Sequence, residues 1–164
     1  MMGKLIGIAR RPARRAPMEE IEHGEITVDG GLAGDHKGPK FPKRRITVLS
    51  REDWEAALAA LSPPAGPADL PWTVRRANLL VEDIRLPRAR GGQIQIGPVV
   101  LEITYPTVPC RRMEEAHSGL LKALMPEWRG GITARVLAGG PVSIGDRVTV
   151  LLGPPDEPSR RLPG

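Results

Sequence analysis

The chain has 164 residues, a formal net charge of +5 and a single cysteine. This length fits one domain, and one cysteine excludes an internal disulfide framework, so we expect a reducing compartment, the cytoplasm. The N-terminal apolar run is too short for a secretory signal, and no later stretch approaches the roughly 18 apolar residues that a membrane-spanning helix needs. We therefore expect a soluble protein with no membrane partner.

Short β-branched runs punctuated by glycine and proline recur along the chain, which is typical of a barrel or sandwich of many strands. The pair Gly97-Pro98 reads as a tight connection between two antiparallel strands, and Gly145 marks another turn into a strand. The expected strands lie at residues 5–8, 26–28, 46–49, 79–81, 93–96, 99–104, 132–136 and 148–151.

One helix is well indicated after the third run, because Ser50 can cap the backbone amide of Asp53. Apolar residues then recur on one helical face, at Trp54, Ala57, Leu58 and Leu61. A second short helix is expected at residues 119–124. The Pro/Gly-rich stretch 62–71 is expected to be a surface loop, with a lid as the alternative.

The fold class that these patterns predict is mainly β with one or two short helices. We expect a single domain over residues 1–152. Residues 153–164 are expected to form a disordered, Pro-rich tail, because residues 153–159 contain three prolines and no apolar periodicity.

The sequence pI near 10.0 raises the question of a nucleic-acid partner. We expect none, because aromatic residues make up only 3% and supply little surface for base stacking. A small anionic ligand would explain some of the basic clusters, whereas the last pair fits a solvated surface. The clusters are Arg10-Arg11, Arg14-Arg15, Lys43-Arg44-Arg45, Arg75-Arg76, Arg111-Arg112 and Arg160-Arg161.

The most informative chemistry follows the longest predicted strand, where Cys110 lies in an expected loop between Pro109 and two arginines. Nearby guanidinium groups favour the thiolate form, which binds metals and attacks sulfur. The alternative is a cysteine packed as a small apolar residue.

Other reactive sites find less support in the sequence. The histidines at positions 23, 36 and 117 match no zinc-binding spacing with Cys110, and no GxSxG turn supports a serine triad. Asp29 and the pair Glu114-Glu115 are expected to be charged surface. A thiolate that is the sole protein ligand suits a metal whose other ligands arrive with an organic cofactor.

Eight segments in order resemble a MOSC domain, the domain named for the C-terminal part of molybdenum cofactor sulfurases. The resemblance spans roughly residues 4–151 and fits the small bacterial stand-alone type. The segments are GLAGDH (31–36), RITVLS (45–50), RRANLLV (75–81), GQIQIG (92–97), LEIT (101–104), PCRR (109–112), RGG (129–131) and GDRV (145–148).

The resemblance implies a β-barrel that binds molybdenum cofactor (molybdopterin), with Cys110 as the catalytic residue and metal ligand or as a persulfide carrier. It also implies that basic and amide side chains bind the phosphate and pterin of the cofactor, and Thr107 is expected in the same pocket. Arginine offers a bidentate fork to phosphate, and asparagine can pair with a heterocycle edge. The matching cofactor-binding positions are Arg45, Arg76, Asn78, Arg112, Asp35 and His36. For Asp35 a turn-stabilising role is the equal alternative.

The resemblance leaves two functions open. The first is a molybdoenzyme that reduces N-hydroxylated or N-oxygenated small molecules with electrons from an external redox protein. The second is a non-catalytic carrier of sulfur or cofactor, served by a cysteine desulfurase. No pyridoxal phosphate site is expected, because the aminotransferase-like part of full-length sulfurases is missing from this sequence. A basic barrel that binds RNA is a more distant third alternative.

Overall fold

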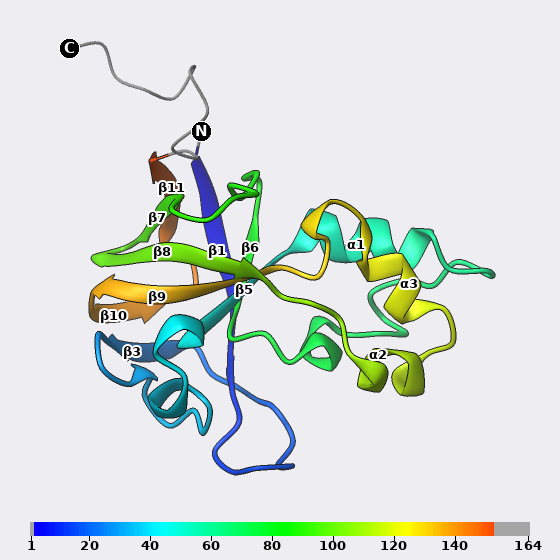
Figure 1. Cartoon of the computed structure of the whole chain (residues 1–164), viewed down its shortest axis with the longest axis horizontal. Coiled ribbons are helices and arrows are strands. Elements are labelled where there is room, and N and C mark those ends of the chain that lie inside the picture. The colour runs from blue at the N-terminus through cyan, green and yellow to red at the C-terminus, as the bar shows by residue number, and fades with distance from the viewer. Residues whose placement is uncertain (1, 153–164) are drawn as a thin grey trace.

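The computed structural model describes residues 2–152 and consists of a β-barrel with a helical layer on one side (Figure 1). The predicted tail at 153–164, with Arg160 and Arg161, lies outside the described residues. Within residues 2–152, every helix falls short of the length and apolar character that crossing a bilayer requires.

Seven strands form the barrel, in the order β11-β7-β8-β9-β5-β6-β1, and pairing between β11 and β1 closes it. All neighbours are antiparallel except β5 and β6, which are parallel. The strands are β1 (Met2–Arg10), β5 (Ile46–Ser50), β6 (Leu79–Glu82), β7 (Gln93–Ile96), β8 (Val99–Pro106), β9 (Ile132–Ala138) and β11 (Arg147–Leu152).

Alternating side chains fill the barrel interior. In β7, Ile94 and Ile96 are buried while the alternating glutamines, Gln93 and Gln95, are partly exposed. Ile94 pairs with Leu101 and Ile96 with Val99 across the two-residue connection at Gly97-Pro98, so the apolar positions of both strands share one face. The mainly β prediction is therefore confirmed as a closed barrel.

A smaller sheet, β10-β3-β4, packs beside the barrel. It contains β3 (His23–Thr27), β4 (Gly31–Leu32) and β10 (Gly140–Ser143), and the short β2 (Glu19–Glu20) pairs with β1. All eight predicted runs fall in strands, although the run 26–28 extends one residue past the end of β3, and β2, β4 and β10 were not predicted. Two of these are only two residues long, and β10 contains the Gly-Pro pair that reads as a turn.

The helical layer covers the outer face of β5 and β6 and has its own apolar core, which includes Leu49, Trp54, Leu80 and Leu120. The helices are α1 (Arg51–Ala59), α2 (Arg111–Ala116) and α3 (Leu120–Leu124). The predicted cap of α1 is confirmed, because Ser50 Oγ accepts from Asp53 N at 3.2 Å.

Two details of the helical side correct or sharpen the prediction. Cys110 lies in a loop, as predicted, at the last position of the segment 107–110, where it is also the N-cap residue of α2. This helix was not predicted, because its six residues are too few to show a helical period. The stretch 62–71 packs against α1, where Leu70 O accepts from Trp54 Nε1 at 3.1 Å, and no residue of that stretch lines the pocket described below.

Candidate active site at Cys110

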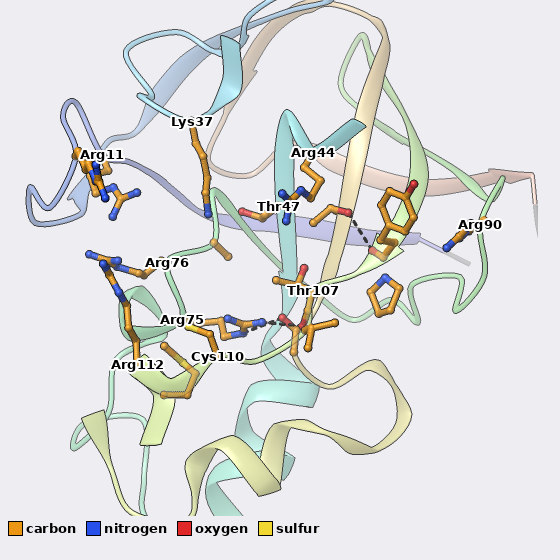
Figure 2. Close-up of a pocket in the computed structure, with 18 residues that line it drawn as sticks. Arg11, Lys37, Arg44, Thr47, Arg75, Arg76, Arg90, Thr107, Cys110 and Arg112 are labelled. Carbon is orange, nitrogen blue, oxygen red and sulfur yellow. Dashed lines mark hydrogen bonds between the residues drawn. The ribbon is translucent and has the colours of Figure 1, made fainter. Parts of the chain in front are cut away.

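A cavity of about 890 Å³ opens beside Cys110, lined by parts of β5, β8, β9, α2 and the loops between them (Figure 2). Its charge is entirely positive, because its lining contains eight cationic side chains and no carboxylate. The cations are seven arginines and one lysine: Arg11, Arg14, Lys37, Arg44, Arg75, Arg76, Arg90 and Arg112.

Arg75 is the deepest of these cations, with only 6% of its surface exposed. Its Nε donates to Gly130 O at 3.0 Å and its Nη2 donates to Thr107 O at 2.8 Å. Burial lowers the pKa of Arg75 to about 10, and the nearby Cys110 acts in the opposite direction. Arg75 therefore stays charged at neutral pH and is held by carbonyl oxygens rather than by a carboxylate.

Two glycines make room for this arrangement. A Cβ on Gly130 would lie 2.5 Å from Thr107 O and 3.0 Å from Arg75 Nη2. Gly131 has φ of +97°, and a Cβ there would collide with the backbone of Val48. The two glycines are thus needed because the chain passes close to the buried guanidinium at Gly130 and close to the backbone of β5 at Gly131.

Arg76 follows Arg75 but takes the left-handed conformation, with φ of +66°, at the end of the 3-10 helix Trp72–Arg75. This reversal sends two adjacent arginines to different places, Arg75 beneath the pocket and Arg76 to its edge near Arg112 (Figure 2). Non-glycine residues adopt this conformation rarely, and such positions often serve a site.

Lys37 is an exposed residue whose amine extends into the pocket (Figure 2). Desolvation of that amine, followed by repulsion from Arg11 and Arg44, lowers the pKa of Lys37, while Asp35 and Cys110 partly oppose the change. Desolvation in the pocket, reinforced by the neighbouring positive charges, therefore disfavours the protonated form of Lys37.

The two arginines after Cys110 separate in the same way. Arg112 lines the pocket, whereas Arg111 is 93% exposed and pairs with Glu115 at 3.9 Å. Successive residues of an α-helix point about 100° apart, so only one of the pair can face the cavity. The expectation that both guanidinium groups flank Cys110 is wrong for Arg111.

The Gly-Asp-His segment does not line the pocket. Asp35 is buried, and its Oδ1 accepts from Arg11 N at 3.0 Å. His36 N donates to Arg11 O at 2.8 Å, and its ring nitrogen Nε2 lies 3.0 Å from Lys40 Nζ. Both residues therefore fix the backbone of Arg11, which does reach the cavity.

Asn78 and Arg45 are also engaged with the chain itself. Asn78 Oδ1 accepts from Thr47 N at 3.0 Å and from Thr47 Oγ1 at 3.1 Å, and its Nδ2 donates to Ala9 O at 3.2 Å. Arg45 Nη1 donates to Gly38 O at 2.8 Å. Thr47 lines the pocket, so Asn78 positions a wall residue.

Of the seven predicted site residues, the structure brings Cys110, Arg76 and Arg112 together in the pocket lining, and Thr107 joins them. The other basic lining residues were not predicted, although most of them belong to the basic clusters of the sequence and Lys37 and Arg90 do not. Each of the five internal basic clusters supplies at least one pocket side chain, namely Arg11, Arg14, Arg44, the pair Arg75 and Arg76, and Arg112.

Two further features bear on what the pocket can hold. The hydroxyl of Thr107 is buried and has no hydrogen-bond partner among the described residues. Within residues 2–152, no group of three or more His, Cys, Asp and Glu side chains is placed to hold a metal ion. A metal at Cys110 would need most of its ligands from another molecule.

Comparison with known proteins supports the resemblance seen in the sequence. The family model for the MOSC domain matches residues 33–149. No curated protein matches the chain.

Solved structures show the same fold at low sequence identity. The YUAD protein from Bacillus subtilis is similar with a TM-score of 0.72 and 17% identity, over 90% of this chain and 94% of that one. YiiM from Escherichia coli is similar with a TM-score of 0.63 and 16% identity, over 90% of this chain and 69% of that one. YiiM from Geobacillus stearothermophilus is similar with a TM-score of 0.61 and 15% identity, over 92% of this chain and 75% of that one.

Proposed function

The chain belongs to the MOSC domain family, and on this premise we propose that its pocket binds molybdenum cofactor with Cys110 as the protein ligand of the metal. The bound protein would reduce N-hydroxylated or N-oxygenated small molecules with electrons from an external redox protein. The observation that carries the proposal is the position of the only thiol, on the wall of a pocket with eight cations and no carboxylate.

The residues present fit the chemistry of this cofactor. Its phosphate is an anion, and none of the eight pocket cations forms an ion pair with another described residue. Arg76 and Arg112 lie near each other at one end of the pocket and would hold the phosphate through bidentate contacts (Figure 2). The unpartnered hydroxyl of Thr107 is available to a polar group of the ligand.

The protein side of the chemistry follows from the same residues. When bound, the cofactor supplies the redox centre, and the chain supplies binding and orientation. Arg75, which stays charged at neutral pH, keeps a positive charge near the Cys110 sulfur. Its contacts to Gly130 and Thr107 hold the two loops that frame the site.

The exposure of Cys110 favours a second candidate function. A sulfur carrier must present its sulfur to two partners in turn, and an exposed thiol at a pocket edge permits this. In this role Cys110 would receive sulfur as a persulfide from a cysteine desulfurase and deliver it to another molybdoenzyme. With either function, we place the protein and its redox or sulfur partner in the cytoplasm, because its one cysteine fits a reducing compartment.

Metal and pterin analysis tests the proposal. Wild-type protein from a host that makes molybdenum cofactor is expected to carry molybdenum and pterin, and Cys110→Ala is expected to lose most of the metal. Ser118→Ala, a change at an exposed residue outside the pocket, serves as the matched control. Equal molybdenum in wild type and Cys110→Ala would rule out Cys110 as a ligand. No molybdenum in either, with a persulfide detected on wild-type Cys110, would favour the carrier.

A further inference from the structure

The pocket has two separate cationic ends. Arg11, Arg76 and Arg112 gather at one end, and Arg90 lies at the opposite end, beyond Arg44 (Figure 2). A single phosphate group is satisfied by two or three cations, which the first end provides. Arg90, at the opposite end, is therefore among the pocket cations that the cofactor phosphate does not need.

Arg90 is held at the pocket by two independent features. Its guanidinium carbon lies 4.4 Å from the centroid of the Tyr105 ring, and Tyr105 also lines the cavity. Hydrogen bonds fix the loop directly after it, because Gly91 N donates to Ile103 O at 2.9 Å and Gly92 O accepts from Ile103 N at 2.8 Å. The loop that carries Arg90 is thus tied to β8, the strand that carries Tyr105.

The stacked arrangement leaves the hydrogen-bonding capacity of Arg90 unused. A guanidinium that rests on an aromatic ring uses its face, whereas its N–H donors lie in its plane and point outward. Arg90 forms no ion pair and no side-chain hydrogen bond with any residue in the range 2–152. Its charge and its donors are therefore open to a ligand in the pocket.

We propose that Arg90 and Tyr105 form the substrate end of the pocket, where Arg90 binds the anionic group of an N-hydroxylated substrate. This rests on the proposed function and narrows its substrate class to small acids, such as an aryl carboxylate that carries a hydroxylamino group. The reaction is R–NHOH + 2 e⁻ + 2 H⁺ → R–NH₂ + H₂O, with electrons from the external redox protein and protons from solvent. The N–O bond breaks, its oxygen leaves as water, and the carboxylate only binds.

Calorimetry with the inert product tests the binding site directly. 4-Aminobenzoate carries the carboxylate, and aniline is its neutral counterpart. We expect Arg90→Gln to weaken binding of 4-aminobenzoate about tenfold, the loss of one charge-assisted contact, and to leave aniline unchanged. Arg85→Gln is the matched control, because it removes the same charge from an exposed position on the same loop outside this pocket.

Turnover separates binding from chemistry. For 4-(hydroxyamino)benzoate, Arg90→Gln is expected to raise KM about tenfold with kcat little changed, because the contact is far from the reacting nitrogen and is made equally throughout the reaction. Phenylhydroxylamine, which lacks the carboxylate, should be insensitive to the change. Tyr105→Leu removes the ring that supports Arg90, so it should raise KM for 4-(hydroxyamino)benzoate as Arg90→Gln does.

Two results would overturn the assignment of Arg90. One is equal binding of 4-aminobenzoate by wild type and Arg90→Gln, and the other is an equal loss in Arg85→Gln, which would mean diffuse attraction. Calorimetry needs no cofactor, so it separates this inference from the proposed function. Wild-type protein without pterin would contradict the proposed function, while carboxylate binding that depends on Arg90 would still establish the site.

Discussion

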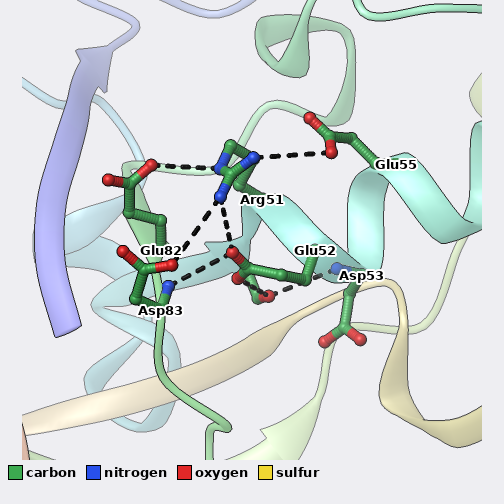
Figure 3. A network of polar contacts seen from close by, with 7 residues as sticks. Arg51, Glu52, Asp53, Glu55, Glu82 and Asp83 are labelled. Atoms are coloured by element: carbon green, nitrogen blue, oxygen red, sulfur yellow. Dashed lines mark hydrogen bonds and ion pairs between the residues drawn. The ribbon is translucent and has the colours of Figure 1, made fainter. Parts of the chain in front are cut away.

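Two arginines of this protein are stabilised in opposite ways. Arg51, at the start of α1, is surrounded by carboxylates (Figure 3): Glu52 at 2.9 Å, Glu55 at 3.5 Å, Glu82 at 3.0 Å and Asp83 at 3.8 Å. Arg75, beneath the pocket, contacts only backbone carbonyl oxygens and has no carboxylate within ion-pair distance among the described residues.

The pKa values follow this difference. Burial alone would lower the pKa of Arg51, but its four carboxylates raise it above the ordinary value. Burial lowers the pKa of Arg75, with only Cys110 opposing. The contrast extends over residues 2–152, where the five arginines that form ion pairs, Arg10, Arg51, Arg88, Arg111 and Arg135, all lie outside the pocket. The ion pairs between described residues thus leave the arginines of the pocket free for a ligand.

The largest effect is expected from removing the carbonyl-bound arginine. Arg75→Ala leaves Gly130 O and Thr107 O without their donors and opens a cavity between the loops, so it should lower the free energy of unfolding by about 2–4 kcal/mol. Urea denaturation followed by circular dichroism measures this. Arg85→Ala, at an exposed position, is the control and should change stability by less than about 0.5 kcal/mol. A similar small change in Arg75→Ala would mean that the loops do not depend on Arg75.

The sequence did not allow us to predict how neighbouring arginines differ in their placement. The basic clusters were visible, but nothing in the sequence says that Arg76 adopts a positive φ, which separates it from Arg75. The missed helix α2 similarly hid the divergence of Arg111 and Arg112. Which member of a pair reaches the pocket depends on backbone conformation, and that is set by tertiary packing.

The barrel was more predictable than the pocket. Alternating or continuous apolar runs such as residues 93–96 and 99–104 encode strands locally, because one face of each strand must be buried. The contact between Arg90 and Tyr105 joins the loop before β7 to the strand β8. No local sequence pattern predicts such a contact. The positioning roles of Asp35 and Asn78 were hidden for the same reason, since each acts on a distant part of the chain.

Replacing Lys37 is expected to raise the free energy of unfolding, by less than replacing Arg75 lowers it. Because its pKa in the folded protein lies below the ordinary 10.5, the folded state binds this proton less tightly than the unfolded chain does. The free energy of unfolding should therefore rise with pH between the lowered pKa and 10.5, and the penalty is fully present at neutral pH. Lys37→Gln should raise the Tm of cofactor-free protein at pH 7.

The pH dependence of this gain checks its origin. The difference in Tm between Lys37→Gln and wild type should shrink as the pH rises toward about 10.5, where both states of the wild type lose the proton. A difference that stays constant over this range would show that the gain does not come from the charge of Lys37.

The smallest change in the free energy of unfolding is expected from removing one carboxylate of the network around Arg51. Glu55 is one of four carboxylates around Arg51 and is itself 40% exposed. Glu55→Ala should therefore lower the free energy of unfolding by less than about 0.5 kcal/mol, and added salt should remove the effect. A loss above 1 kcal/mol in urea denaturation would mean that the network is more cooperative than its exposure suggests.

The pterin content of two adjacent arginine variants tests the central claim most directly. Arg112→Ala removes an unpaired cation from the pocket, and Arg111→Ala removes a cation that points to solvent and pairs with Glu115. We predict that Arg112→Ala binds the cofactor roughly ten- to a hundredfold more weakly, from the loss of a charge-assisted contact. Arg111→Ala should retain wild-type pterin when both proteins are purified at physiological ionic strength. Equal pterin in the two variants, whether retained or lost, would contradict a defined anion site formed by the unpaired cations of the pocket.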